Sequence, residues 1–304
     1  MDNQQEMARL REEINRLREQ VLWYRRTYED RSLLGLLYER LSRGRIRARG
    51  SLGRSWLRGG TGRRVRIRRA QAAPDLSGRV LCCVVNHNEG ANAARLMQSL
   101  APCFDTVLLD SGSDRPPRGS VRYGNLFYSG LLNEAFAIAD RAGYRQLFFL
   151  CSDVRIEPAD VPRLYERIRG LDFSTTGVYS PSARGTCHFF CRRQPGGGLR
   201  TVPFVEGFLF VADLDILRKF CPVDTGRNLY GWGLDIAKGY FARQLGRISV
   251  VDDDIEVEHP AGTGYSREMA EYEMLSWVRT FRDEDLAAYF NQQLALLNQQ
   301  TNLT

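Results

Sequence analysis

Three side chains of this 304-residue chain have the types and the order that metal-assisted group transfer requires. Asp153 follows an apolar run, Asp235 ends the segment Tyr230-Gly-Trp-Gly-Leu-Asp235, and His259 comes 24 residues later. Carboxylate oxygens bind hard divalent cations, and a neutral imidazole suits Mn²⁺ better than Mg²⁺. A positioned carboxylate can also take a proton from an attacking hydroxyl. We therefore expect one cleft that holds a metal, a diphosphate and a general base.

The elements that must position these residues alternate between strand and helix from residue 79 onward. Apolar runs predict strands over 79–85, 106–109 and 146–150, and helical patterns cover 91–100, 129–142 and 158–169. Continuous apolar strands separated by helices predict a parallel sheet covered on both faces. Ligands bind such sheets at the carboxyl ends of the strands, which is where Asn88, Asp110 and Asp153 fall.

The second half of the chain has a different pattern. We expect strands and turns over 172–211, and a helix that starts at Asp235 and ends at Gly246. A strand over 247–251 and two amphipathic helices over 266–297 complete the sequence.

Residues 5–30 predict a helix with a heptad seam, because apolar side chains recur at spacings of three and four. The seam consists of Met7, Leu10, Ile14, Leu17, Val21, Tyr24 and Tyr28. A helix with so narrow an apolar stripe is only marginally stable in water unless it packs against another element. We expect a homo-oligomer, with packing against the rest of the chain as the alternative. The expected domains are a coiled-coil helix (1–41), an Arg/Gly-rich linker (42–78), an α/β domain (79–265) and C-terminal helices (266–304).

The net charge of +7 is concentrated in one segment. Residues 43–69 contain eleven Arg and no acidic residue. Such a segment can bind phosphates of an anionic membrane surface or of nucleic acid. A solvated tether is the alternative interpretation.

The seven Cys residues form no recognisable zinc motif. Cys187 and Cys191 are four apart, but no second pair follows, and His188 alone does not complete a site. The first residues are polar and charged, unlike a signal peptide, and no apolar run approaches the ~20 residues that span a bilayer. We expect reduced thiols and a cytoplasmic location, with the inner face of the membrane as an alternative.

Seven features follow one another along residues 80–265. They are Val84-Val-Asn-His-Asn-Glu89, Leu109-Asp-Ser-Gly-Ser-Asp114, Asn133, Leu150-Cys-Ser-Asp-Val154, Val205-Glu-Gly-Phe-Leu-Phe210, Tyr230-Gly-Trp-Gly-Leu-Asp235 and His259. In order and rough spacing they resemble glycosyltransferases of family 2. The resemblance implies a GT-A fold, which is a Rossmann-like, mostly parallel sheet flanked by helices. It also implies a nucleotide-diphosphate sugar as donor, Mn²⁺ or Mg²⁺, and inversion at the anomeric carbon.

The resemblance implies roles for individual residues on the donor side. It places nucleotide contacts at Asn88, Glu89, Asp110 and Asn133, and donor-sugar contacts at Glu206 and Gly207. For Asp110, capping of its own turn is an alternative. Asn88 or Glu89 could instead cap the helix at residue 91.

The resemblance also implies roles at the reacting centre. Asp153 and His259 are the expected metal ligands, and Asp235 is the expected base. A plain helix N-cap is the alternative for Asp235. Trp232 is expected to stack on an acceptor sugar, or else to serve packing. We interpret His87 and His188 as structural.

Two departures from the family pattern leave other functions open. Cys151 replaces the first carboxylate of an Asp-X-Asp motif, and Leu234 replaces the Glu that usually precedes the base. A non-catalytic coiled-coil scaffold on nucleic acid or membrane is therefore one alternative, and a glycosyltransferase acting on modified DNA bases is another. A nucleotidyltransferase is disfavoured, because Asn86-His-Asn-Glu-Gly90 lacks a Gly-rich basic loop.

Overall fold

The computed structural model describes residues 57–58, 64–70, 74–259 and 265–301. The predicted coiled coil over 5–30 and much of the arginine-rich segment lie outside the described residues. The fold reported below belongs to the compact unit Ser55–Thr304.

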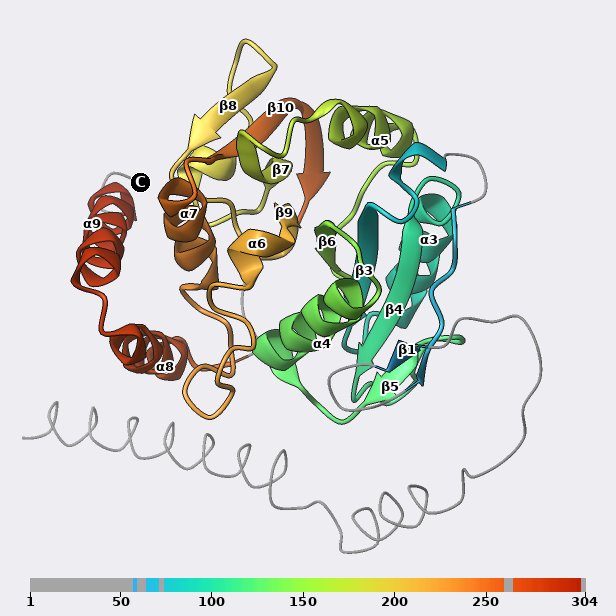
Figure 1. Ribbon diagram of the computed structural model, residues 1–304, viewed down its shortest axis with the longest axis horizontal. Helices are drawn as coiled ribbons and strands as arrows, with labels where there is room; N and C mark the ends of the chain where they lie inside the picture. Colours follow the sequence, from blue (N-terminus) through green and yellow to red (C-terminus); the bar gives the residue numbers. More distant parts are fainter. Residues whose placement is uncertain (1–56, 59–63, 71–73, 260–264, 302–304) are drawn as a thin grey trace, which may run out of the picture. The chain divides into compact units, whose positions relative to one another are not determined.

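A sheet of eight strands in the order β5-β4-β3-β6-β9-β7-β10-β8 forms the centre of this unit (Figure 1). Its first half contains the parallel neighbours β3 (Val80–Asn86), β4 (Asp105–Ser111), β5 (Val121–Tyr123) and β6 (Gln146–Cys151). β3 and β4 are buried along their whole length, which explains their continuous apolar sequences. The three-residue β5 is too short for periodicity to reveal.

The second half of the sheet mixes directions. β9 (Leu209–Asp213) runs antiparallel to both β6 and β7 (Thr176–Arg184). β10 (Ile248–Glu258) is parallel to β7 and antiparallel to β8 (Leu199–Val202). The sheet is therefore mostly parallel, as predicted. β10 extends well past the predicted end at 251, because an irregularity between Asp252 and Glu256 accommodates acidic residues that interrupt the apolar pattern.

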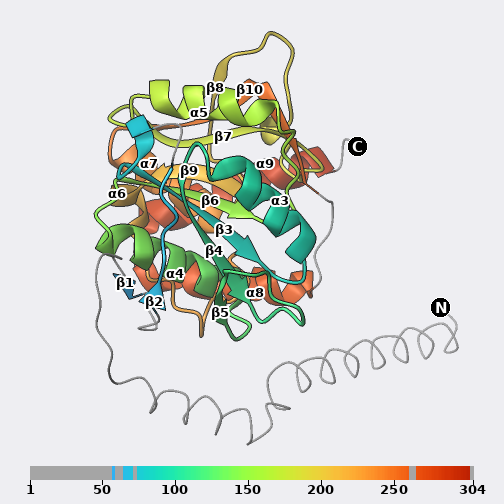
Figure 2. The ribbon, with the colours of Figure 1, turned by 90° about the vertical axis from the view of Figure 1, so that its right-hand side faces the viewer.

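Helices cover both faces of the sheet (Figures 1 and 2). Alternate side chains of β3 enter different cores, so that Cys83 lies on one face and Cys82 on the other. The first core includes residues of α4 (Phe127–Arg141) and α7 (Leu234–Gln244). The second core includes residues of α3 (Gly90–Leu100) and α5 (Asp160–Gly170). The α/β architecture expected from the sequence is thus confirmed.

Two C-terminal helices, α8 (Arg267–Val278) and α9 (Glu284–Thr301), pack into the first core, as does the short α6 (Leu214–Leu217). Tyr289 of α9 lies against Tyr240 of α7, with ring centroids 5.6 Å apart. These helices therefore support α7, the helix that carries Asp235. Within the described residues, no helix has the length and apolar character needed to cross a bilayer.

The described end of the predicted linker is part of the domain rather than a solvated tether. Arg68 forms a two-way backbone bridge with Thr106, at 2.9 and 2.8 Å. Arg69 pairs with the fully buried carboxylate of Asp105 at 2.7 Å. Burial would raise the pKa of Asp105, but the N–H groups of Ala70 and Gly78, with Tyr144 and Arg69, lower it below its ordinary value. The buried carboxylate therefore anchors this segment beside β4.

Candidate active site

Asp153 and His259, the two predicted metal ligands, lie side by side. Nε2 of His259 is 3.4 Å from Oδ2 of Asp153. Oδ1 of Asp153 and Nδ1 of His259 are buried without a hydrogen-bond partner among the described residues, which is unusual for buried polar atoms. The ring of His259 stacks on Phe208, with centroids 4.2 Å apart. An aspartate oxygen and an imidazole nitrogen fit a divalent cation such as Mn²⁺. Each of these two side chains has one buried atom that forms no hydrogen bond with the described residues and could serve as a ligand.

Backbone pairing explains how these distant positions meet. Arg155 and Glu258 form an isolated antiparallel bridge, with N–H···O distances of 2.8 and 3.0 Å. Asp153 precedes this bridge by two residues on one side, and His259 follows it directly on the other. The amide of Asn92, in the first turn of α3, donates to the carbonyl oxygens on either side of Asp153, at 2.6 and 2.9 Å. The loop that carries Asp153 is thereby held from two directions.

Asp235 lies in the first turn of α7 and contacts His188, a residue expected from the sequence to be structural. Nε2 of His188 is 3.3 Å from Oδ2 of Asp235. The ring of His188 stacks on Phe190 and meets the edge of Phe204, at centroid distances of 5.6 and 5.1 Å. No spacing pattern links the two positions, because the contact joins a loop after β7 to the start of a helix. The neighbouring Cys187 was the only local signal that this histidine has polar surroundings.

The contact gives both groups their charged forms at neutral pH. Burial opposes a charge on His188, but its interactions with Asp235 and Cys187 outweigh it and raise the pKa of His188 to about 11. Burial would raise the pKa of Asp235, but His188 and Lys238 lower it below its ordinary value. The pair is mostly buried, with side chains 12% and 17% exposed. Asp235 is therefore ionised, as a base must be before it takes a proton.

Lys238 lies one turn after Asp235 on α7 and is fully buried. Its Nζ has no hydrogen-bond partner among the described residues and lies 4.1 Å from the centroid of Phe210. Burial lowers the pKa of Lys238 to about 8, against the attraction of the Asp235 carboxylate. Lys238 thus adds a second positive charge near the base.

Glycines allow the loop before α7 to close around Tyr128. A Cβ atom at Gly231 would lie 2.2 Å from the Tyr128 ring, and one at Gly207 would lie 2.5 Å from its hydroxyl. Gly231 also has φ of +80°, which disfavours other residues. The Tyr128 hydroxyl donates to the carbonyl of Gly207 at 2.7 Å. Gly207, a predicted donor-sugar contact, thus has a clear packing role. Trp232 of the same loop donates from Nε1 to the Tyr265 hydroxyl at 3.0 Å.

Asp110, the residue before the end of β4, lies within a buried hydrogen-bond network. Its Oδ1 accepts from Nδ2 of Asn86 at 2.7 Å and from Oγ of Ser113 at 2.6 Å. Its Oδ2 accepts from the backbone N–H of Ser113 at 3.2 Å. These contacts match the turn-capping alternative for Asp110. Asn86 also accepts from Ser152 at 2.9 Å, so the network joins the ends of β3, β4 and β6.

Asn88 and Glu89 are exposed after β3. Asn88 has φ of +59°, and its Oδ1 accepts from the backbone N–H of Asp114 at 2.9 Å. Glu89 occupies the N-cap position of α3 without a side-chain hydrogen bond to the helix. Neither side chain caps α3, so both remain at the strand-end edge of the sheet.

Asn133 and Glu206 have different surroundings from those expected. The amide of Asn133 donates to the carbonyl of Val223 at 2.8 Å and accepts from its N–H at 2.7 Å, so it fastens the loop after α6. Glu206 accepts from the hydroxyl of Thr186 and from Sγ of Cys187, the latter at 3.3 Å. Asn133 is thus committed to the backbone, whereas Glu206 joins the loop that carries His188.

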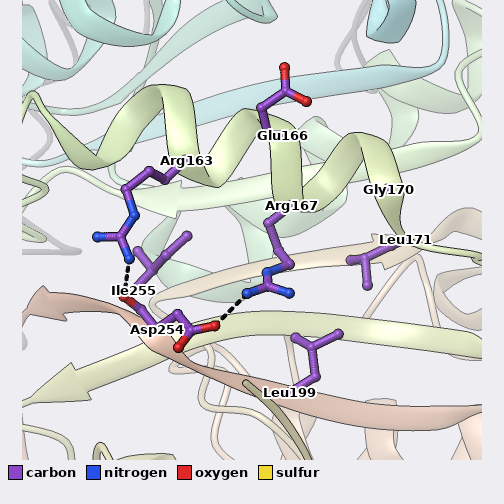
Figure 3. A pocket seen from close by; sticks show the side chains of 8 residues that line it. All are labelled: Arg163, Glu166, Arg167, Gly170, Leu171, Leu199, Asp254 and Ile255. Carbon is purple, nitrogen blue, oxygen red and sulfur yellow. Dashed lines mark hydrogen bonds and ion pairs between the residues drawn. The ribbon is translucent and has the colours of Figure 1, made fainter. Parts of the chain in front are cut away.

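A cavity of about 450 Å³ lies elsewhere, between α5 and the strands β8 and β10 (Figure 3). Arg163 donates to the carbonyl of Asp254 at 2.7 Å, and Arg167 donates to its carboxylate at 2.6 Å. The cavity is lined by Arg163, Glu166, Arg167, Gly170, Leu171, Leu199, Asp254 and Ile255. It contains none of the predicted site residues.

A second cavity, of about 790 Å³, borders the described end of the arginine-rich segment. Arg66, Arg68 and Arg118 contribute charged side chains to its lining, and Met97 and Leu108 contribute apolar ones. It too contains none of the predicted site residues.

No protein-family model and no curated protein matches this chain. Among solved structures, it is similar to GalNAc-T7 with UDP, GalNAc and Mn²⁺, at 16% identity and a TM-score of 0.45. That match covers 61% of this chain and 44% of the other, so this chain spans less than half of that relative.

Two further structures are similar. One is glucosyl-3-phosphoglycerate synthase from Mycobacterium tuberculosis in complex with Mn²⁺, UDP-glucose and glycerol 3-phosphate. It has 14% identity and a TM-score of 0.44, and the match covers 67% of this chain and 78% of that one. S. aureus TarS residues 1–349 has 13% identity and a TM-score of 0.40, with 60% of each chain covered.

Proposed function

We propose that this protein is a metal-dependent glycosyltransferase. It would move a sugar from a nucleotide-diphosphate sugar to a hydroxyl acceptor, with inversion at the anomeric carbon. The observation that carries the proposal is the pairing of Asp153 with His259, both with unused buried atoms. One short segment connects this pair to the base candidate Asp235. Phe208 stacks on His259, and Glu206, two residues earlier, contacts the loop whose histidine pairs with Asp235.

The donor is proposed to lie along the carboxyl ends of the strands. Asn88 and Glu89 are exposed beside the loop that Asp110 organises, where the nucleoside would bind. The diphosphate would then reach Asp153 and His259. A divalent cation held by these two residues would neutralise the diphosphate and stabilise it as a leaving group.

The chemistry of transfer would centre on Asp235. The acceptor hydroxyl attacks the anomeric carbon from the face opposite the nucleotide, while the bond between the sugar and the diphosphate breaks. Asp235 takes the hydroxyl proton. Its Oδ2 contacts His188, and its Oδ1 accepts from the backbone N–H of Ile236 at 2.9 Å, so the carboxylate is oriented before substrate arrives.

The acceptor is proposed to rest against aromatic rings near the base. Tyr265 stacks on Tyr230 at a centroid distance of 4.5 Å and accepts a hydrogen bond from Trp232. Aromatic faces of this kind stack on sugar rings, which suits a glycan, a lipid-linked sugar or another hydroxylated polymer.

A donor screen tests the proposal. The full-length protein is incubated with a panel of nucleotide-diphosphate sugars in the presence of Mn²⁺, Mg²⁺ or a chelator. We expect one donor to raise the melting temperature in a metal-dependent way, because a ligand of the native state stabilises it. Slow metal-dependent release of the nucleoside diphosphate should accompany binding. If no donor in the panel binds and no nucleoside diphosphate is released, the transferase function is rejected and the non-catalytic scaffold is favoured.

A further inference from the structure

A second group of metal-binding side chains lies beside Asp235. Ligand atoms of Cys187, His188 and Glu206 all lie within 4.8 Å of one another. Within the described part of the chain, no other three His, Cys, Asp or Glu side chains meet this spacing. The Cys187 thiol donates to Glu206 at 3.3 Å, so two of the three already touch. Nδ1 of His188 is buried and has no hydrogen-bond partner among the described residues.

We propose that Cys187, His188 and Glu206 form a zinc site. A thiolate, an imidazole and a carboxylate are ordinary zinc ligands, and three protein ligands leave a fourth position for water or another ligand. Zinc bonds of roughly 2.0–2.3 Å put ligand atoms about 3.5 Å apart, so small side-chain rotations close the site. A thiolate also favours Zn²⁺ over Mn²⁺. This site therefore differs in metal preference from the Asp153–His259 pair.

Asp235 would orient one of the proposed zinc ligands, His188, through a hydrogen bond. Histidines that bind zinc usually donate their other ring N–H to a carboxylate, which fixes the ring orientation. His188 already directs Nε2 to Oδ2 of Asp235 at 3.3 Å. That contact leaves Nδ1, the buried atom without a partner, for the ion. Zinc would replace the proton of Nδ1 and that of the Cys187 thiol, both released to water, and the neutral ring would keep its Nε2–H on Asp235. Zinc would therefore hold the histidine that contacts the proposed base.

Cobalt titration tests the site directly. Metal-free, full-length protein is titrated with Co²⁺, which gives a near-ultraviolet charge-transfer absorption when a thiolate binds it. We expect this absorption to saturate at one equivalent and to disappear when Zn²⁺ displaces the cobalt. Cys187→Ser should abolish it, and Glu206→Gln should weaken cobalt binding by at least about tenfold. Cys187 is exposed, so the serine variant should keep its metal-free melting temperature.

Two matched variants complete the experiment. Cys103→Ser changes a partly buried thiol elsewhere, and Asp153→Asn changes the other proposed metal site; both should keep the absorption. No thiolate absorption in the wild type, or its persistence in Cys187→Ser, would overturn the proposal. The readout needs no sugar donor, so the zinc site and the transferase function stand or fall separately.

Discussion

Asp235 and His188 form a mostly buried ion pair in which Oδ2 and Nε2 are 3.3 Å apart. The pair connects the first turn of α7 with the loop after β7. Loss of one partner should cost more stability here than in a surface pair, because it leaves a charge in a poorly solvated site. The carboxylate is therefore held in its ionised form and in one orientation, which are the two properties that the proposed base needs.

Asp235→Asn should keep the fold and donor binding, but at a lower melting temperature, because His188 loses its ionised partner. It should lower transfer by about 10²–10⁴-fold, because an amide cannot accept the proton. Initial rates under saturating donor, with melting temperature and donor affinity alongside, measure the effect. Asp140→Asn is the matched control, since Asp140 is exposed and pairs with Arg218 at the surface. Substantial transfer by Asp235→Asn would reject the assignment of the base.

His259→Ala and Asp153→Asn should each weaken Mn²⁺-dependent donor binding, by about tenfold or more, because each removes one of two neighbouring metal donors. Calorimetry of donor binding at several Mn²⁺ concentrations measures the effect. Asp172→Asn changes an exposed turn and serves as the control. Unchanged Mn²⁺ dependence in both variants would show that the metal binds elsewhere.

Lys238→Met should stabilise the protein at pH 7. The folded pKa of about 8 lies below the ordinary 10.5, and this difference corresponds to a cost of up to about 3 kcal/mol when both states are protonated. Between these pH values the unfolded chain binds more protons, so the stability contributed by this group rises with pH. The advantage of Lys238→Met should therefore shrink from pH 8 to 10.5.

Denaturant unfolding at several pH values measures the Lys238 effect. Lys219→Met, which changes an exposed lysine, should show neither the gain nor its pH dependence. A stability difference between Lys238→Met and the wild type that stays constant over this pH range would contradict the burial argument.

Gly231→Ala should destabilise the protein more than Gly143→Ala. Both glycines have left-handed φ values, +80° and +77°, so both substitutions should cost about 1–2 kcal/mol in the backbone. Only at Gly231 does the new methyl group meet Tyr128, at 2.2 Å; no atom lies within 4 Å at Gly143. Urea unfolding of the two variants isolates the cost of this overlap. Equal losses would mean that Tyr128 moves aside freely.

Deletion of residues 1–35 should lower the oligomeric state without abolishing donor hydrolysis, because the predicted heptad seam over 5–30 is the proposed contact between subunits. Light scattering gives the mass of both proteins, and the donor assay reports on the remaining domain. An identical oligomeric state after deletion would reject the assembly role. Since residues 5–30 lie outside the described part of the chain, the seam remains a prediction.

Much of the fold could be predicted from the sequence, because buried parallel strands appear as short continuous apolar runs and their flanking helices show apolar residues at helical spacing. The meeting of Asp153 and His259 was expected from the resemblance to glycosyltransferases of family 2; of the two, only Asp153 directly followed a predicted strand, because the strand before His259 was expected to end at 251. The antiparallel insertion of β9 was not predictable, since an apolar run does not reveal its direction.

The partners of individual side chains were harder to predict than the strands. His188 meets Asp235 through loop geometry that no spacing rule describes. Asn133 fits the family pattern by position, yet its amide bonds the backbone of Val223. Arg69 belongs to a charge-rich segment that resembled a tether, and only the buried carboxylate of Asp105 reveals where it attaches.

Tyr128 contacts two loops that are far apart in the sequence, through Gly207 on one side and Gly231 on the other. The first loop leads to the residue that stacks on His259, and the second leads to Asp235. Both loops therefore pack on the same ring. A larger residue at either glycine would meet this one ring, so the packing of each loop depends on a side chain that the other loop also holds.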